Sequence, residues 1–166
     1  MSRWRAPSPR SSPYITPAGF RRLEAELKDL WERRGAVTRA LSAAAAEGDR
    51  SENAEYIYRK KELRELDRRI RYLQKRLPAL RVVDRVRDPA LVYFGARVTL
   101  RDGDARQMTC RIVGADELGQ EAGTISVDSP LARALLGKGP GEEVSVQTGA
   151  EEKIYAILDV AYERSD

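Results

Sequence analysis

Two stretches of the chain repeat apolar residues at alternating steps of three and four. The first stretch follows Thr16 and Pro17, which are a typical helix N-cap and first helical residue. Such steps keep apolar side chains on one face of a helix and form the seam of a coiled coil. The pattern therefore predicts two long helices. Their seam positions are 20, 23, 27, 30, 34, 37, 41 and 44, then 56, 59, 63, 66, 70, 73, 77 and 80, apolar except for Arg34 and Arg59.

The two sets of seam positions mirror one another, because each position in the first set has a partner in the second whose number brings the sum to 100. This symmetry predicts an antiparallel hairpin that folds back near residue 50. Arg34 would face Leu66, and Arg59 would face Leu41, each with its stem over the leucine and its charge directed to solvent. About 30 helical residues give a hairpin roughly 45 Å long. A projection of this length suggests insertion into a deep partner, but by itself the hairpin is equally consistent with a structural element, either a spacer or a dimerisation element.

Small residues mark the turn of the hairpin, and a proline marks its end. Residues 43–48, AAAAEG, narrow the seam, and Gly48 is suited to the left-handed conformation that ends a helix. Pro78 falls in the last turn of the second helix, which it should end or kink because it lacks a backbone donor. We therefore expect a domain boundary near residue 80.

Strand-like patterns replace the heptads after that boundary. A DGD sequence at 102–104 is a hairpin-turn signal, and one helix is expected from Ser129 to Gly137 with Ser129 as its cap. Alternation and β-branched residues predict the strands. The strand-like runs are RVVDRV, ARVTLRD, ARQMTCRIVG, GTISVDSP, EEVSVQ and KIYAILDVAY.

These signals predict an α+β fold in three parts. Residues 1–14 are expected to form a flexible tail, rich in Ser and Pro, and residues 15–80 a coiled-coil hairpin with an acidic tip. Residues 81–166 are expected to form a small domain in which a mostly antiparallel sheet packs against one helix.

The composition limits the chemistry available to the chain. Its 166 residues include 30 Lys and Arg against 26 Asp and Glu, so the formal charge is +4 and the pI about 9.3. Cys110 is the single cysteine and histidine is absent, which excludes a disulfide framework, a zinc finger and histidine-based acid–base catalysis. Neither a signal peptide nor a membrane-length apolar run is evident, so we expect a cytoplasmic protein with no membrane partner.

Two acids, Asp49 and Glu52, stand at the turn in the sequence EGDRSENAEY. One interpretation is structural, with Asp49 as N-cap and Glu52 as the third helical residue of a capping box. The other is functional, because carboxylates at the end of a slim projection can be delivered into a partner's cavity to hold Mg²⁺ and orient a water. Exposed acids alone cannot exclude water or preorganise a substrate, so any chemistry would be shared with a partner.

A row of cations follows on the second helix, opposite its seam. Between residues 59 and 76 there are nine Lys or Arg and three acids, a net charge of +6. A solvated face is the simplest interpretation, but an unbroken row of one sign more often indicates a polyanion such as nucleic-acid phosphate. Tyr56 falls in the seam and should pack there, whereas Tyr58 is available to stack or hydrogen-bond. The row consists of Lys61, Arg64, Arg68, Arg71 and Lys75.

The segment GDRSENAEYIYRKKELRELDRRIRYL, which carries these acids and cations, resembles the Gre family of bacterial transcript-cleavage factors. The resemblance continues through YFGARVTL, RIVGADE and SVDSPLARALLGK, and covers nearly everything from Ile15 onward. Only residues 1–14 and Pro78 depart from the family pattern.

The resemblance implies a coiled coil that enters the secondary channel of RNA polymerase and an FKBP-like domain that docks at the channel rim. Asp49 and Glu52 would help hold the second catalytic Mg²⁺, so that the polymerase's own active site cleaves backtracked nascent RNA. Lys61, Arg64, Arg68 and Arg71 would attract that RNA. The chain would then be a monomeric activator that binds no cofactor alone and is not itself an enzyme.

Two alternatives stay open at the sequence level. A channel-binding regulator could reshape the polymerase without stimulating cleavage, and an FKBP-like fold could support proline isomerisation, although fold alone does not establish activity.

Overall fold

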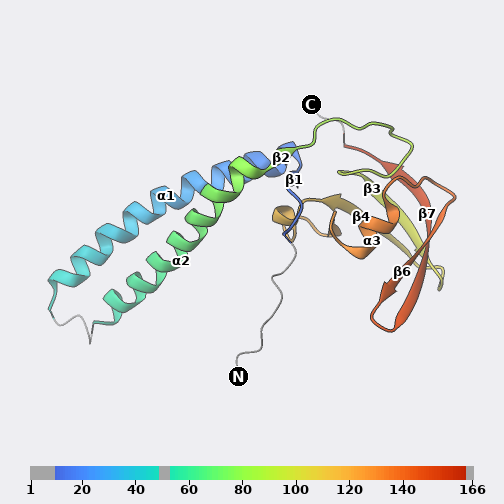
Figure 1. The fold of residues 1–166 in the computed structure, drawn as a ribbon. Helices are drawn as coiled ribbons and strands as arrows, with labels where there is room; N and C mark the ends of the chain where they lie inside the picture. The colour runs from blue at the N-terminus through green and yellow to red at the C-terminus, as the bar shows by residue number, and fades with distance from the viewer. Residues whose placement is uncertain (1–9, 49–52, 164–166) are drawn as a thin grey trace, which may run out of the picture. The chain divides into compact units, whose positions relative to one another are not determined.

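The structure is a computed structural model that describes residues 10–48 and 53–163. It divides into two compact units (Figure 1). One unit is Ala18–Leu80, and the other joins the N-terminal segment through Pro17 to the chain from Arg81 onward. The expected boundary near residue 80 thus coincides with a division between units, but the residues just before the first helix belong with the C-terminal unit.

Two long helices form the first unit, α1 (Pro17–Ala46) and α2 (Ala54–Arg76). Pro17 is the first helical residue, as the sequence predicts. A 3₁₀ turn, η1 (Leu77–Ala79), follows α2 and contains Pro78, which confirms that the α-helix ends ahead of this proline. The last two seam positions therefore lie beyond α2, although both remain half-buried.

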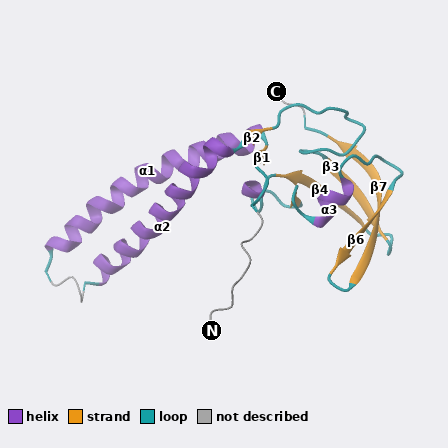
Figure 2. Cartoon of the chain, in the orientation of Figure 1, coloured by secondary structure: helices purple, strands orange, loops and turns teal. Residues whose placement is uncertain are grey.

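Figure 2 shows the two helices as long purple ribbons. Ion pairs that cross between them confirm the antiparallel register. Arg33 contacts Glu62 at 2.7 Å, and Arg69 contacts Glu26 at 2.6 Å. The residue numbers of each pair add to 95, so both pairs flank the same seam. Every seam position on the two helices is buried or half-buried; the fully buried ones are Leu23, Val37 and Ala44 on α1 and Leu66, Ile70 and Leu73 on α2.

The two arginines of the seam differ from expectation in one respect. Their charges are paired with acids, because Arg34 contacts Asp67 at 2.6 Å and Arg59 contacts Glu55 at 2.7 Å and Glu62 at 3.0 Å. Carboxylates beside the seam are close enough to bind each half-buried guanidinium, so its charge is neutralised within the hairpin.

A five-stranded sheet organises the second unit and confirms the α+β class. Its strand order is β5-β4-β3-β7-β6, with β4 and β5 parallel and the other pairs antiparallel. One short helix, α3 (Pro130–Leu135), accompanies it, and the Ser129 hydroxyl accepts from the Ala132 amide at 3.2 Å, as predicted for a cap. The strands are β3 (Arg97–Asp102), β4 (Gln107–Val113), β5 (Thr124–Ser126), β6 (Glu143–Thr148) and β7 (Glu151–Ala161).

The core of this unit lies between the sheet and α3. Val98 and Leu100 of β3 point inward and meet inward residues of the other strands and of the helix. The predicted turn after β3 is present, with the Asp102 carboxylate accepting from the amides of Asp104 and Arg106 at 3.0 and 2.9 Å. The inward residues that join Val98 and Leu100 include Cys110, Ile112, Leu135 and Ile157.

The chain before α1 is tied into the second unit. Strand β1 (Tyr14–Ile15) pairs in parallel with β2 (Arg81–Val82), which is all that the expected RVVDRV strand forms. The backbone amide and hydroxyl of Ser12 both donate to Asp128. The expected flexible tail therefore cannot extend to residue 14, because backbone pairing and a carboxylate hold its last residues.

The buried carboxylate of Glu117 accepts hydrogen bonds from Thr16, the last residue before α1. Glu117, in the 3₁₀ turn η2 (Ala115–Glu117), is 4% exposed and accepts from the Thr16 amide at 3.1 Å and from the Thr16 hydroxyl. It also accepts from the Gly114 amide at 2.9 Å. A side chain at Gly114 would approach the Tyr14 carbonyl within 2.1 Å, so only glycine fits there.

Candidate functional site

The side chain of Asn53 forms hydrogen bonds to both helices at the end of the hairpin. Its side-chain oxygen accepts from the Tyr56 amide at 3.1 Å, which makes it the N-cap of α2. Its amide nitrogen donates to the carbonyl of Ala44, in the last turn of α1, at 2.9 Å. Gly48 follows α1 with φ of 130°, a conformation that suits glycine, as predicted. One side chain therefore ties the end of α1 to the start of α2.

This arrangement corrects the structural interpretation of the tip acids. Asp49 and Glu52 lie outside the described residues, but α2 begins at Ala54, so its cap is Asn53 and its third residue is Tyr56. The predicted capping box is wrong because Asn53, a residue as good as Asp in this role, stands directly before the helix. The sequence held this signal, since Asn53 precedes AEY with an acid in the first turn.

The metal-binding interpretation of the two acids stays a prediction. Asp and Glu provide the hard oxygen ligands that Mg²⁺ prefers, so their chemistry fits this ion. Among residues 10–48 and 53–163, no three His, Cys, Asp or Glu side chains gather in a group that could hold a metal ion.

The predicted cation row lies on an exposed face of α2. All five of its members are exposed, whereas Leu66, Ile70 and Leu73 on the seam side are buried. Within the part of the chain that the structure describes, none of the five forms an ion pair. This group, called the cation row below, is Lys61, Arg64, Arg68, Arg71 and Lys75.

Neighbouring arginines on the same helix are neutralised instead. Hydrogen bonds that Arg59 donates to Glu55 and Glu62 raise its pKa, and the Arg33 guanidinium holds the pKa of Glu62 below its usual value. Arg69 donates to both oxygens of Glu26, at 2.6 and 2.9 Å. The structure thus separates cations that hold the hairpin together from cations whose charge faces solvent, and the second group is the one available to a polyanion.

Exposed aromatic rings stand beside the cation row. Tyr58 is 59% exposed and Tyr72 is 43% exposed, whereas Tyr56 is half-buried, in accord with its predicted place in the seam. The Arg59 guanidinium lies 5.4 Å from the centre of the Tyr58 ring, and the Arg69 guanidinium lies 5.3 Å from that of Tyr72. Both tyrosines therefore pair with an arginine that is itself held by carboxylates.

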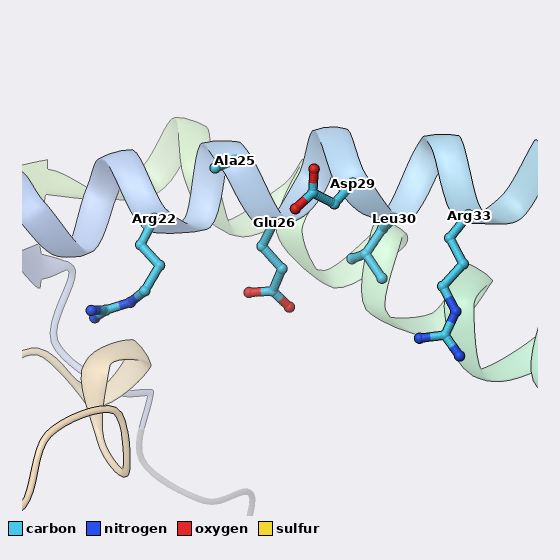
Figure 3. A pocket seen from close by; sticks show the side chains of 6 residues that line it. All are labelled: Arg22, Ala25, Glu26, Asp29, Leu30 and Arg33. Carbon is cyan, nitrogen blue, oxygen red and sulfur yellow. The ribbon is translucent and has the colours of Figure 1, made fainter.

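An open hollow runs along one flank of α1 (Figure 3). Its charged side chains are two acids that lie between two arginines along the helix, and two of the four, Glu26 and Arg33, form the ion pairs that cross to α2. The hollow is therefore part of the flank that stabilises the hairpin. Its lining consists of Arg22, Ala25, Glu26, Asp29, Leu30 and Arg33.

Two further features bear on the possible chemistry. Cys110 is 1% exposed, and burial raises the pKa of its thiol to about 11, so it is a poor nucleophile at neutral pH. Of the described helices, none combines the length and the apolar character required to cross a bilayer.

Comparison with known proteins matches the whole of this architecture. Residues 13–82 match the family model "Transcription elongation factor, N-terminal", and residues 88–162 match "Transcription elongation factor, GreA/GreB, C-term". The first match ends at residue 82, two residues past Leu80, where the structure divides into its units.

Curated relatives match over almost their full length. Transcription elongation factor GreB of Pseudomonas aeruginosa is 57% identical over 164 residues, with 98% of each chain covered. The GreB of Xanthomonas axonopodis pv. citri is 56% identical over 165 residues, again with 98% of each covered. The GreB of Yersinia pestis is 51% identical over 157 residues, covering 93% of this chain and 92% of the relative. The segments RSENAEY and DRRIRYL also look more like GreB than GreA. The chain thus belongs to the GreA/GreB family of transcription elongation factors, and its resemblance is to the GreB proteins.

Proposed function

We propose that this chain inserts its hairpin into the secondary channel of RNA polymerase and stimulates Mg²⁺-dependent endonucleolytic cleavage of backtracked nascent RNA. Arrested transcription complexes would be rescued in this way. The observation that carries the proposal is the unpaired cation row, which runs along α2, the helix that begins two residues after Glu52 in the sequence. The 30-residue helix α1 is long enough, at roughly 45 Å, to carry that loop deep into a partner.

The two tip acids would take part in the chemistry. Asp49 and Glu52 would add carboxylate oxygens to a Mg²⁺ site completed by the polymerase, and such an ion makes a bound water a stronger nucleophile. Asn53 would fix the end of α1 and the start of α2, which flank the two acids in the sequence.

The remaining parts would bind and position. The cation row would attract the extruded RNA through its phosphates. The C-terminal unit would dock at the rim of the channel, which raises the effective concentration of the hairpin at its site. The chain would act as a monomer in the cytoplasm, and as an activator of the polymerase's own cleavage activity, without a bound cofactor when alone.

A cleavage assay on stalled complexes tests this proposal. The protein is added to polymerase halted in a backtracked state, with the nascent RNA labelled at its 5′ end and Mg²⁺ present. Rapid shortening of the RNA, followed by resumed elongation, is the expected result. Binding to the polymerase without RNA shortening would instead identify a non-catalytic channel regulator. Acceleration of prolyl isomerisation in a peptide, without any effect on the stalled complex, would favour an isomerase.

A further inference from the structure

We infer that Tyr58, in the second turn of α2, is a stacking platform for a base of single-stranded RNA. Tyr58 has the most exposed side chain among the large hydrophobic residues that the structure describes, with 59% of its surface accessible. Tyrosine is enriched at interfaces because it combines an apolar ring with a polar hydroxyl, and every RNA base offers a flat face for stacking. This inference rests on the proposed function, because it assigns a contact for the same RNA.

The guanidinium of Arg59, which two carboxylates hold in place, lies beside the ring of Tyr58. The Arg59 guanidinium lies 5.4 Å from the ring centre, and it is held by Glu55 at 2.7 Å and by Glu62 at 3.0 Å. Glu62 in turn binds Arg33 of the other helix at 2.7 Å. These contacts restrict the guanidinium beside the ring, so a base that stacks on Tyr58 meets a preorganised surface.

The surrounding charge favours nucleic acid over an apolar protein surface. Lys61 lies one helical turn after Tyr58, and Arg64 one turn further, and both belong to the unpaired cation row. Phosphates that follow the row would bring the attached bases to the side of the helix where Tyr58 is exposed. Aromatic rings interleaved with unpaired cations are the arrangement by which proteins bind single strands without reading their sequence.

The same pairing recurs farther along α2. Tyr72 is 43% exposed, and its ring centre lies 5.3 Å from the Arg69 guanidinium, which Glu26 holds. Fourteen residues separate the two tyrosines, which places Tyr72 about four turns along the same side of the helix, at roughly 21 Å. Tyr58 is the nearer of the two to the tip, so it would receive a base close to the site of cleavage.

Direct RNA binding by the full-length protein tests the inference without the polymerase. A labelled single-stranded RNA of about twelve nucleotides is titrated with wild type, Tyr58→Ala and Tyr58→Phe, across roughly 50 to 200 mM salt. Ile57→Ala is the matched control, because Ile57 is the adjacent residue and is 54% exposed. A ribose-phosphate strand of equal length that lacks bases is the second probe. Circular dichroism of each variant confirms that the hairpin is folded.

Tyr58→Ala should weaken binding of the RNA by about fivefold to a hundredfold, with the salt slope unchanged. Tyr58→Phe and Ile57→Ala should bind as wild type does, and the strand without bases should bind wild type and Tyr58→Ala equally. Equal affinity of Tyr58→Ala for the RNA, equal losses in the Ala and Phe variants, or no detectable wild-type binding at low salt would each overturn the inference. Failure of the cleavage proposal would leave this result unaffected, because no polymerase is present.

Discussion

The side-chain amide of Asn53 donates to the main-chain carbonyl of Ala44 at 2.9 Å, across the end of the hairpin. The other end of the same amide group accepts from the first turn of α2 at 3.1 Å. A single residue thus satisfies a backbone donor of one helix and a backbone acceptor of the other. This contact fixes the end of α1 relative to the start of α2.

Substitutions at Asn53 separate its two roles. Asn53→Asp keeps a cap of similar quality but loses the donor to Ala44, whereas Asn53→Ala loses both contacts. We expect Asn53→Ala to destabilise the hairpin by about 1 to 2 kcal/mol, and Asn53→Asp by about half as much. Hydrogen exchange of the Tyr56 amide measures the effect locally. Equal exchange rates in wild type and Asn53→Ala would mean that the cap contributes nothing.

Removal of four cations from the cation row should reduce the electrostatic part of RNA binding. Lys61, Arg64, Arg68 and Arg71 changed together to Ala should lower RNA affinity and reduce the salt slope of binding by up to about 3. Cleavage of long backtracked RNA should fall in the same variant. Each change should alter folding by no more than about 0.5 kcal/mol, because all four side chains are exposed.

A variant with the same loss of charge on α1 is the control. It carries Ala at four exposed cations of that helix, namely Arg21, Arg22, Lys28 and Arg39. This variant should keep a steeper salt slope than the α2 variant. If the two variants lose affinity to the same extent, net charge alone accounts for RNA binding and the cation row has no special part in it.

Burial of Cys110 predicts a pH-dependent contribution to stability. The pKa of its thiol is raised from 9.0 to about 11 in the folded state, because burial disfavours the thiolate. The contribution is fully present below pH 9 and is lost as the pH rises toward 11, since the unfolded chain releases its proton first. Relative to Cys110→Ala, the unfolding free energy of wild type should fall by about 2 kcal/mol between pH 8 and pH 11. Parallel pH profiles for the two proteins would contradict this.

The hairpin was predictable because its signals are repeated along the sequence. The mirrored seam set the register, and the ion pairs Arg33–Glu62 and Glu26–Arg69 confirm it. Pro17 and Pro78 marked the two ends of the helical region, because proline has restricted backbone geometry. Repetition makes such a pattern robust to any single exception.

Features that depend on one residue, or on contacts between distant segments, were harder to predict. The acids beside Gly48 suggested a capping box, but Asn53 takes the cap because it stands immediately before the helix. The Thr16 contact with Glu117 spans 101 positions and has no periodic signal. The exposure of the cation row could be predicted from helix periodicity. Its lack of ion pairs could be established only from the side-chain positions in the structure.

The central claim is that Asp49 and Glu52 act in RNA cleavage and not in folding. Because Asn53 caps α2, the free energy of unfolding of the double variant Asp49→Asn, Glu52→Gln should lie within about 0.5 kcal/mol of the wild-type value. The same variant should still compete for the polymerase, since the helices and the C-terminal unit are unchanged. Its loss of two carboxylate ligands removes a preorganised electrostatic contact with the Mg²⁺ site, a class of contact worth about 10²- to 10³-fold in rate.

The most direct measurement is the rate of RNA cleavage in a backtracked polymerase complex at saturating concentrations of this double variant and of wild type, across a Mg²⁺ titration. Binding and unfolding are measured on the same preparations. We predict cleavage slower by at least tens of times, with normal binding and unfolding, and a partial recovery at high Mg²⁺. A cleavage rate close to that of wild type would contradict the account, because the tip acids would then have no part in the chemistry.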